Sequence, residues 1–367
     1  MSLFNIYTWG HNLYYQCGIE TPDIIQQPTL VNNNSYKKVA PGYYHNLTID
    51  NNDNLYGWGR NEQYQLGLNH NNNLYDITNI NNTNTWIDID AGRYHSVAID
   101  HTNNLYYWGN ICDRIIKEPE LLDNNIIKAK CGNLFIAYIN NNKELYVIGT
   151  INYSQFRLET DSYAQTRDGR TGPLRLFKHN EPFHMLSNVE EIYCSSNHII
   201  AIDSDNKKYV MGYHPLVEYE FTDQVTNLSR KFKISSTSFN LIPDYTNFIP
   251  ENILKITSKS SHSLLLDTDS KLYGLGNNFH KELDDIDNRK LNKFIDLDIS
   301  NVSDISAGNN HSLILLDDKI YSQGLNNYNQ CNDSNSYIIN GFTLVDELNN
   351  YDNIYCGLDF NIATKTI

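Results

Sequence analysis

A repeated frame of residues is the feature that most constrains what this chain can fold into. The segments PGYYHNLTIDNNDNLYGWG from Pro41, AGRYHSVAIDHTNNLYYWG from Ala91 and AGNNHSLILLDDKIYSQG from Ala307 share a Gly-x-x-His turn, an alternating apolar stretch, an Asp/Asn turn and a closing Tyr-x-x-Gly. The closing glycine occurs seven times, at Gly10, Gly59, Gly109, Gly149, Gly212, Gly276 and Gly324. Self-similarity with a period of this length indicates a solenoid, a propeller or a repeat array.

The front half of the frame also occurs seven times, and its copies relate the two ends of the chain. The last copy, CGLDFNIATKTI from Cys356, is a front half without a back half, whereas FNIYTWG from Phe4 is a back half without a front half. We therefore expect residues 1–10 and 352–367 to share one blade, with residues 3–9 paired with residues 354–367. Five of the front halves keep their histidine: His45, His95, His198, His262 and His311.

Each repeat predicts a short antiparallel sheet. Leu47 and Ile49 alternate along one strand, DNNDN supplies turn residues that tolerate the left-handed region, and LYGWG returns as the next strand. One such sheet cannot bury its own faces, but seven sheets arranged radially can. The sequence therefore predicts an all-β fold, a seven-bladed β-propeller forming a single domain over residues 1–367. Two long insertions are expected, at about 150–190 and 213–254.

The repeats resemble those of the RCC1 (regulator of chromosome condensation) family, with the best agreement in AGRYHS, LYYWGN and Gln65-Leu66-Gly67. The resemblance covers the whole chain, although the repeats through residues 131–262 are degenerate. It implies a seven-bladed propeller that binds proteins. Family members include guanine-nucleotide exchange factors for the Ran GTPase, in which acidic and His side chains of the Gly-x-x-His turns contribute, and interaction modules without exchange activity.

The residues inside the Gly-x-x-His turns are the candidate partner-binding residues. Tyr and Arg are enriched at the energetic centres of protein interfaces, and both occur here. An acid is retained in only one turn, and that turn has Phe360 in place of the histidine. The candidates are Tyr43, Tyr44, Arg93, Tyr94, Asn309, Asn310 and Asp359.

The first insertion contains a short hairpin signal, an Asp-Gly pair flanked by Thr and Arg. Residues 150–185 carry five basic and four acidic side chains, so this segment is locally positive in a chain of net charge −15. An Arg-bearing hairpin would suit a partner-binding finger, and the alternative is a tolerated surface loop. The candidate residues are Arg167, Asp168, Arg170 and Arg175. The second insertion is richer in apolar residues and is expected to pack down or to add strands.

No catalytic constellation, cofactor motif or metal-ligand set is predicted. The five histidines belong to different blades, so they would form a ring rather than a cluster, and we expect each to bond local backbone groups. His179, Glu181 and His184 are too few for a zinc site. Five of the six cysteines occupy apolar repeat positions, which predicts packing roles in a reducing compartment.

Composition limits the partners. A net charge of −15 disfavours direct nucleic-acid binding, and the chain has neither a secretory signal pattern nor an apolar run of membrane-spanning length. We expect an intracellular protein. Three functions fit: a non-catalytic interaction propeller (adaptor or mimic), an exchange factor for a Ran-type small GTPase, and a structural assembly component.

Overall fold

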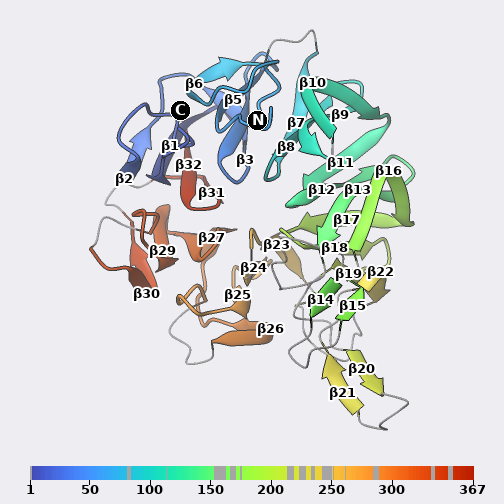
Figure 1. Cartoon of the computed structure of the whole chain (residues 1–367). Coiled ribbons are helices and arrows are strands. Elements are labelled where there is room, and N and C mark those ends of the chain that lie inside the picture. The colour runs from blue at the N-terminus through green and yellow to red at the C-terminus, as the bar shows by residue number, and fades with distance from the viewer. Residues whose placement is uncertain are drawn as a thin grey trace.

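The described part of the chain is built of β-strands. The computed structural model describes residues 2–80, 84–112, 114–152, 163–165, 171–173, 176–212, 219–222, 229–232, 236–241, 250, 252–260, 262–283, 289–331, 335–345 and 350–367. Four-stranded antiparallel sheets follow one another around a ring, which Figure 1 shows from blue at the start of the chain to red at its end. The predicted seven-bladed all-β propeller is confirmed.

Each blade runs from an inner strand, next to the axis, to an outer strand at the rim. Blades one to three consist of β3 (Tyr36–Pro41), β4 (His45–Asp50), β5 (Leu55–Gly59) and β6 (Leu74–Asn79); β7 (Trp86–Ala91), β8 (His95–Asp100), β9 (Leu105–Ile111) and β10 (Arg114–Asp123); and β11 (Ile126–Cys131), β12 (Leu134–Asn140), β13 (Leu145–Asn152) and β16 (Leu176–Leu186). Blades four to six consist of β17 (Val189–Cys194), β18 (His198–Asp203), β19 (Lys208–Gly212) and β22 (Ser236–Leu241); β23 (Ile253–Thr257), β24 (His262–Asp267), β25 (Leu272–Asn277) and β26 (Lys290–Asp296); and β27 (Val302–Ala307), β28 (His311–Leu316), β29 (Lys319–Leu325) and β30 (Ile338–Leu344).

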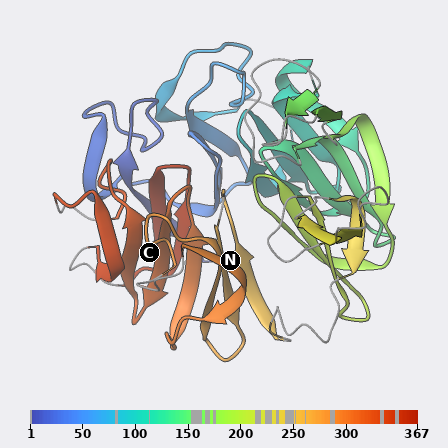
Figure 2. The same ribbon diagram turned by 60° about the horizontal axis from the view of Figure 1, so that its bottom comes forward.

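The seventh blade joins the two ends of the chain. It consists of β31 (Asn353–Cys356), β32 (Phe360–Thr366), β1 (Phe4–His11) and β2 (Ile24–Leu30). Strands β1 and β32 pair antiparallel from Phe4↔Thr366 to Gly10↔Phe360, and Figures 1 and 2 show the blue first strand beside the red last ones. The expected pairing of the two ends is confirmed.

The closing glycines are required by a close approach between neighbouring strands. Gly109 has φ +96°, and a Cβ there would lie 2.3 Å from the carbonyl oxygen of Tyr94. A side chain at this position would force the two strands apart, so the repeat keeps glycine where the third strand ends. Gly42 has a different reason, since its Cβ would lie 2.5 Å from Cε1 of His45, whose ring occupies that space.

A carboxylate organises the hairpin between the second and third strands of a blade. Asp50 Oδ1 accepts hydrogen bonds from the backbone N–H groups of Asn52 and Asn54, and its Oδ2 accepts one from the Tyr56 hydroxyl at 3.1 Å. The same arrangement recurs at Asp267 with Tyr273, where the hydroxyl bond is 3.0 Å. A third copy is Asp203 with Tyr209 at 2.9 Å, so the Asp before the turn and the Tyr after it are a structural feature of these three hairpins.

The core lies between adjacent blades and is rich in aromatic side chains. Trp9, Trp58 and Trp108 are fully buried. Each indole N–H donates to the backbone carbonyl of a Gln in the preceding blade of the ring, with Trp108 bonding Gln65 at 2.9 Å. The Gln-Leu-Gly part of the repeat thus ties one blade to the next.

Both insertions leave the ring at the same end of their blades. The first follows β13, whose Asn152 pairs with Leu176 of β16, and the second follows β19, whose Gly212 pairs with Ser236 of β22. They contain two hairpins outside the ring, β14 (Tyr163–Gln165) with β15 (Thr171–Pro173), and β20 (Tyr219–Thr222) with β21 (Ser229–Phe232). The strands on either side of the Asp-Gly signal therefore pair, and the second insertion adds strands as expected.

In the part of the chain that the structure describes, no helix has the length and hydropathy that a membrane crossing requires.

Candidate protein-binding surface

One face of the ring carries all the Gly-x-x-His turns, because each turn joins the inner strand of a blade to the second strand. The loops that follow the closing glycines lie at the same face, since His45 pairs with Gly59 and His311 with Gly324. We call this the His-turn face, and the opposite one, which carries the Asp/Asn hairpins, the Asx-turn face. Both insertions follow closing glycines, so they emerge at the His-turn face.

Four of the repeat histidines, His45, His95, His262 and His311, bond to the next blade below this face. His45 Nε2 lies 2.9 Å from the Ser96 hydroxyl, which itself donates to the Gln65 carbonyl at 2.8 Å. Because Ser96 uses its proton for Gln65, His45 must be the donor through Nε2–H. The pair His262 and Ser312 repeats the contact at 2.9 Å. These partners lie in the next blade rather than in the local backbone expected from the sequence.

Burial keeps these imidazoles neutral. It lowers the pKa of His45 and His262 to about 3, and that of His95 and His311 to about 4. Among the described residues, no group of three or more His, Cys, Asp or Glu side chains is arranged to hold a metal ion. These histidines therefore join neighbouring blades, and in the part of the chain that the structure describes they form no set of metal ligands.

A cluster of Tyr and Arg side chains lies above the histidines, and we call it the Tyr–Arg cluster. The Arg93 guanidinium lies 4.8 Å from the ring centroid of Tyr94, and that of Arg60 lies 4.6 Å from the Tyr14 ring and 5.8 Å from the Tyr94 ring. Stacking on tyrosine holds each guanidinium in one orientation. These four side chains are only partly buried, and Arg60 is also paired with Glu62. The cluster therefore presents the Arg93 cation, the Arg60–Glu62 ion pair and aromatic faces to solvent.

The cluster continues toward the seventh and sixth blades. The rings of Tyr14 and Tyr44 lie 5.3 Å apart, and the His11 ring lies 4.3 Å from that of Tyr328. The Tyr44 hydroxyl donates to Asp359 Oδ2 at 3.4 Å. Burial raises the pKa of Tyr44 and of Asp359, and it lowers the pKa of His11. The cluster thus joins side chains of four blades.

The structure separates the predicted candidates into groups. Tyr44, Arg93 and Tyr94 belong to the Tyr–Arg cluster, and Asp359 supports it from below while itself 8% exposed. Tyr43 is 7% exposed and points inward, where its hydroxyl bonds that of Ser196 across the axis. Asn309 and Asn310 are partly exposed on the same face. Arg167, Asp168, Arg170 and Arg175 lie outside the described residues.

Sequence reasoning missed His11, Tyr14, Arg60 and Tyr328. They occupy the first and fourth positions after a closing glycine, as in HNLYYQCG and RNEQYQLG. The sequence carried a signal for them, because these residues occupy fixed positions after each closing glycine and the loops lie on the same face as the Gly-x-x-His turns. Apolar side chains project from the third position of two such loops, Leu13 at 52% and Phe279 at 56% exposure.

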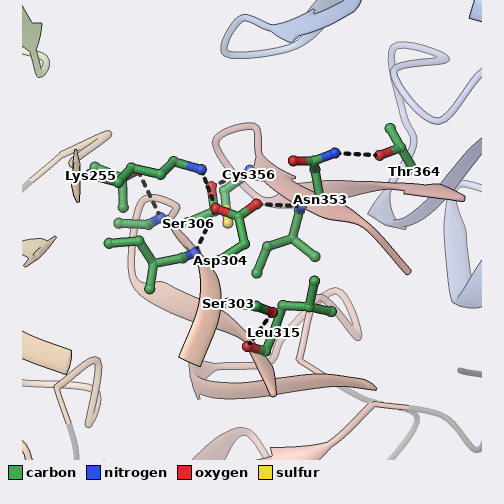
Figure 3. Close-up of polar contacts among 12 residues, drawn as sticks. Lys255, Ser303, Asp304, Ser306, Leu315, Asn353, Cys356 and Thr364 are labelled. Atoms are coloured by element: carbon green, nitrogen blue, oxygen red, sulfur yellow. Dashed lines mark hydrogen bonds and ion pairs between the residues drawn. The ribbon is translucent and has the colours of Figure 1, made fainter. Parts of the chain in front are cut away.

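The inner strands carry alternating charges that pair across blade boundaries. Lys38 Nζ lies 2.6 Å from Asp88, and Lys128 pairs with Glu191. Figure 3 shows the third pair, in which Lys255 Nζ lies 2.6 Å from Asp304 Oδ1. The same carboxylate accepts from the backbone N–H of Ile354 at 2.9 Å. The seventh blade has neutral Asn353 at this position, and its amide reaches Thr364.

The seven blades form a closed propeller, which presents its loops on a rigid ring. The family model described as the regulator of chromosome condensation (RCC1) repeat matches residues 5–49 and 52–99, and a second model of that description matches residues 302–330. The chain therefore carries RCC1 repeats. No curated protein sequence matches it.

Solved structures agree with this fold. Prp20p from Saccharomyces cerevisiae is similar with a TM-score of 0.78 at 18% identity, over 100% of this chain and 92% of that one. Yeast RCC1 (Prp20) bound to Kap60 is similar with a TM-score of 0.77 at 19% identity, over 100% and 89%. Human WBSCR16 is similar with a TM-score of 0.72 at 12% identity, over 99% of both chains. At these identities the likeness establishes an RCC1-like β-propeller fold.

Proposed function

We propose that the chain is a non-catalytic protein-interaction propeller, an RCC1-like adaptor or mimic, that binds its partner through the His-turn face. The observation that carries this proposal is the Tyr–Arg cluster. Its guanidinium groups are held on tyrosine rings, so little side-chain entropy remains to be lost on binding. The exposed Leu13, next to Tyr14, adds apolar area beside it, and the exposed Phe279 lies in the fifth blade's loop on the same face. The similar protein Prp20p has been studied for its binding to Gsp1p and histones, and yeast RCC1 for its complex with Kap60.

Alanine substitutions divided between the two faces test this proposal. The substitutions Tyr94→Ala and Arg60→Ala should each weaken capture of the partner from a native lysate at least about tenfold, because hot-spot residues contribute 2 kcal/mol or more. Lys207→Ala and Ile127→Ala, on the Asx-turn face, should leave capture unchanged. Equal retention by all four variants would refute the proposal. Co-elution with a large particle without dependence on either face would favour a structural assembly component.

A second function, guanine-nucleotide exchange on a Ran-type small GTPase, is favoured by one further observation. The insertion that contains Arg167 and Arg170 leaves the ring at the His-turn face, where a hairpin could press on a bound GTPase. Release of labelled GDP measures this function directly. Acceleration by the wild-type chain that is lost in Arg167→Ala/Arg170→Ala would establish it, whereas spontaneous release rates across a panel of small GTPases would exclude it.

We also infer an intracellular location and no direct contact with nucleic acid. All six cysteines are free thiols, which is typical of reducing compartments. The net charge of −15 would be repelled by a phosphate backbone.

A further inference from the structure

The inner strands enclose a cavity on the axis of the ring that the proposed function does not use. Its volume is about 470 Å³, and all seven blades contribute to its lining. A cavity of this size is in the range of small-molecule sites. The Tyr–Arg cluster lies outside it, on the His-turn face.

The cavity is closed at the His-turn face by side chains that cross the axis. The hydroxyl of Tyr43 in the first blade bonds Ser196 in the fourth, and Ser196 in turn donates to the carbonyl of Lys259 in the fifth. The Lys259 ammonium donates back to the carbonyl of Pro41 at 2.6 Å. Backbone bonds link neighbouring turns around this plug, such as Tyr43 N–H to Gly92 at 3.1 Å. A ligand would therefore enter from the Asx-turn face.

The charge of the lining is opposite to that of the whole protein. Five lysines and two aspartates line the cavity, whereas the chain carries −15. Near the opening, lysines are neutralised by carboxylates, as in Lys38 with Asp88. Deeper in, Asp90 is the carboxylate that acts most strongly on Lys130, ahead of Asp88 and Glu191. Burial lowers the pKa of Lys259, and Asp90 opposes that effect. No carboxylate of the described residues forms an ion pair with Lys259, so the closed end has an excess of positive charge.

Hydroxyl groups around the same end are poised to donate. Ser306 Oγ accepts from the Cys356 N–H at 2.8 Å, and Thr257 Oγ1 accepts from the Ala307 N–H at 3.3 Å. Since each oxygen already accepts a bond, its proton remains for a further acceptor. Tyr193 and Tyr355 also line the cavity. The closed end thus combines ammonium and hydroxyl donors from several directions.

We propose that this axial cavity binds a phosphate group, either free phosphate or the phosphate of a small ester that fits the cavity. A tetrahedral dianion has acceptor oxygens in several directions, which matches donors converging from different blades. Lys130 and Lys259 supply the compensating charge, and Ser306 and Thr257 supply neutral hydrogen bonds. The pairing of Lys38 and Lys255 with carboxylates leaves the outer part of the cavity nearly neutral.

Calorimetric titration at constant ionic strength tests the site with inorganic phosphate, glucose 6-phosphate and glucose. We expect saturable binding of the first two and none of glucose. Glucose 6-phosphate binding at least tenfold tighter would identify an ester as the ligand class, and equal affinity would identify free phosphate.

Substitutions in the cavity test which residues bind the phosphate. Lys259→Met should weaken phosphate binding about tenfold and Ser306→Ala about threefold. The matched Lys271→Met, whose side chain is exposed on the same blade, should leave binding unchanged. Absence of saturable phosphate binding, or equal weakening by Lys271→Met, would overturn the proposal.

A measurement on the wild-type chain keeps the test independent of variant folding. Cys131 and Cys194 line the cavity, whereas Cys112 lies outside it. Inorganic phosphate should slow the modification of Cys131 and Cys194 by a small thiosulfonate reagent, read by mass spectrometry, and leave Cys112 unaffected. Equal rates with and without phosphate would count against the site.

Discussion

The histidine of each Gly-x-x-His turn shows how one residue can serve both the turn and the contact between blades. Its ring fills the space left by the glycine three residues earlier, and its Nε2–H reaches the next blade, as His311 does to Asn361 at 2.7 Å. In the third blade Phe135 takes the same place over Gly132. The turn therefore requires a flat ring, and the contact requires a donor only where the next blade offers an acceptor.

These neutral histidines predict loss of stability in mild acid. Burial lowers the pKa of His45 and His262 to about 3, and of His95 and His311 to about 4. The unfolded chain binds these protons below about pH 6.5, so the free energy of unfolding should decrease as pH falls from about 6.5 toward 4. Each histidine contributes up to about 1.4 kcal/mol per pH unit. Urea unfolding between pH 8 and pH 4.5 measures the slope.

The slope has a matched control. His311→Gln keeps a side-chain donor but removes one titrating group, so the slope should flatten by about one proton, whereas His70→Gln, outside the turns, should leave it unchanged. Asp359 and Glu282 have the opposite effect on this slope. Burial raises their pKa, so these two groups make the free energy of unfolding increase as pH falls. Constant stability between pH 7 and pH 5 would contradict the assignment of neutral histidines.

At the scale of the element, ion pairs between side chains of alternating charge join the inner strands of adjacent blades. Six blades present lysine and carboxylate in turn, and the three pairs are Lys38 with Asp88, Lys128 with Glu191 and Lys255 with Asp304. Seven is an odd number, so complete alternation would place two like charges side by side. The neutral Asn353 occupies the remaining position and avoids that repulsion.

The two members of one pair should differ in their effect on stability. Asp304 is 6% exposed and also accepts the buried Ile354 N–H, so Asp304→Ala leaves a donor without a partner and should cost about 2–4 kcal/mol. Lys255 is the more exposed partner, and Lys255→Ala should cost less than about 1 kcal/mol. Urea unfolding measures both, with Lys207→Ala as a surface control. A larger cost for Lys255→Ala would contradict this account.

At the scale of the whole molecule, the ring is closed by seven consecutive residue pairs between β1 and β32. Trp9 completes that closure, because it is fully buried and donates to the Gln330 carbonyl of the sixth blade at 3.1 Å. The two ends of the chain are therefore held by a sheet and by a core.

Trp9→Ala should cost about 3–5 kcal/mol, the usual price of removing a buried Trp, and should open the seventh blade first. Hydrogen exchange of residues 360–366 should then become faster than that of the second blade. Trp108→Ala, of the same size and burial, is the control and should accelerate exchange in the second blade instead. Uniform acceleration in both variants would show that closure has no special role.

Much of the fold could be predicted because the repeat encodes it locally. The alternation in HNLTID, the Asp or Asn residues of the turns and the closing glycines act within a few residues, so seven copies specify seven sheets. The shared blade followed from two half-repeats at the ends. The candidate surface was predicted only in part. Tyr44, Arg93 and Tyr94 were found from their turns, but Arg60 and Tyr14 join them from the loops that follow the closing glycines of the first and seventh blades.

The sequence by itself determined the blade count, the strand order and the meeting of the chain ends, because each depends on contacts within one repeat or on the repeat number. Only the tertiary structure decided that Tyr43 turns inward to Ser196, that Lys259 crosses to Pro41 and that lysines line an axial cavity. Those contacts join the first blade to the fourth and fifth across the axis. No local sequence pattern specifies these contacts across the axis, because the geometry of ring closure decides which inner strands face one another.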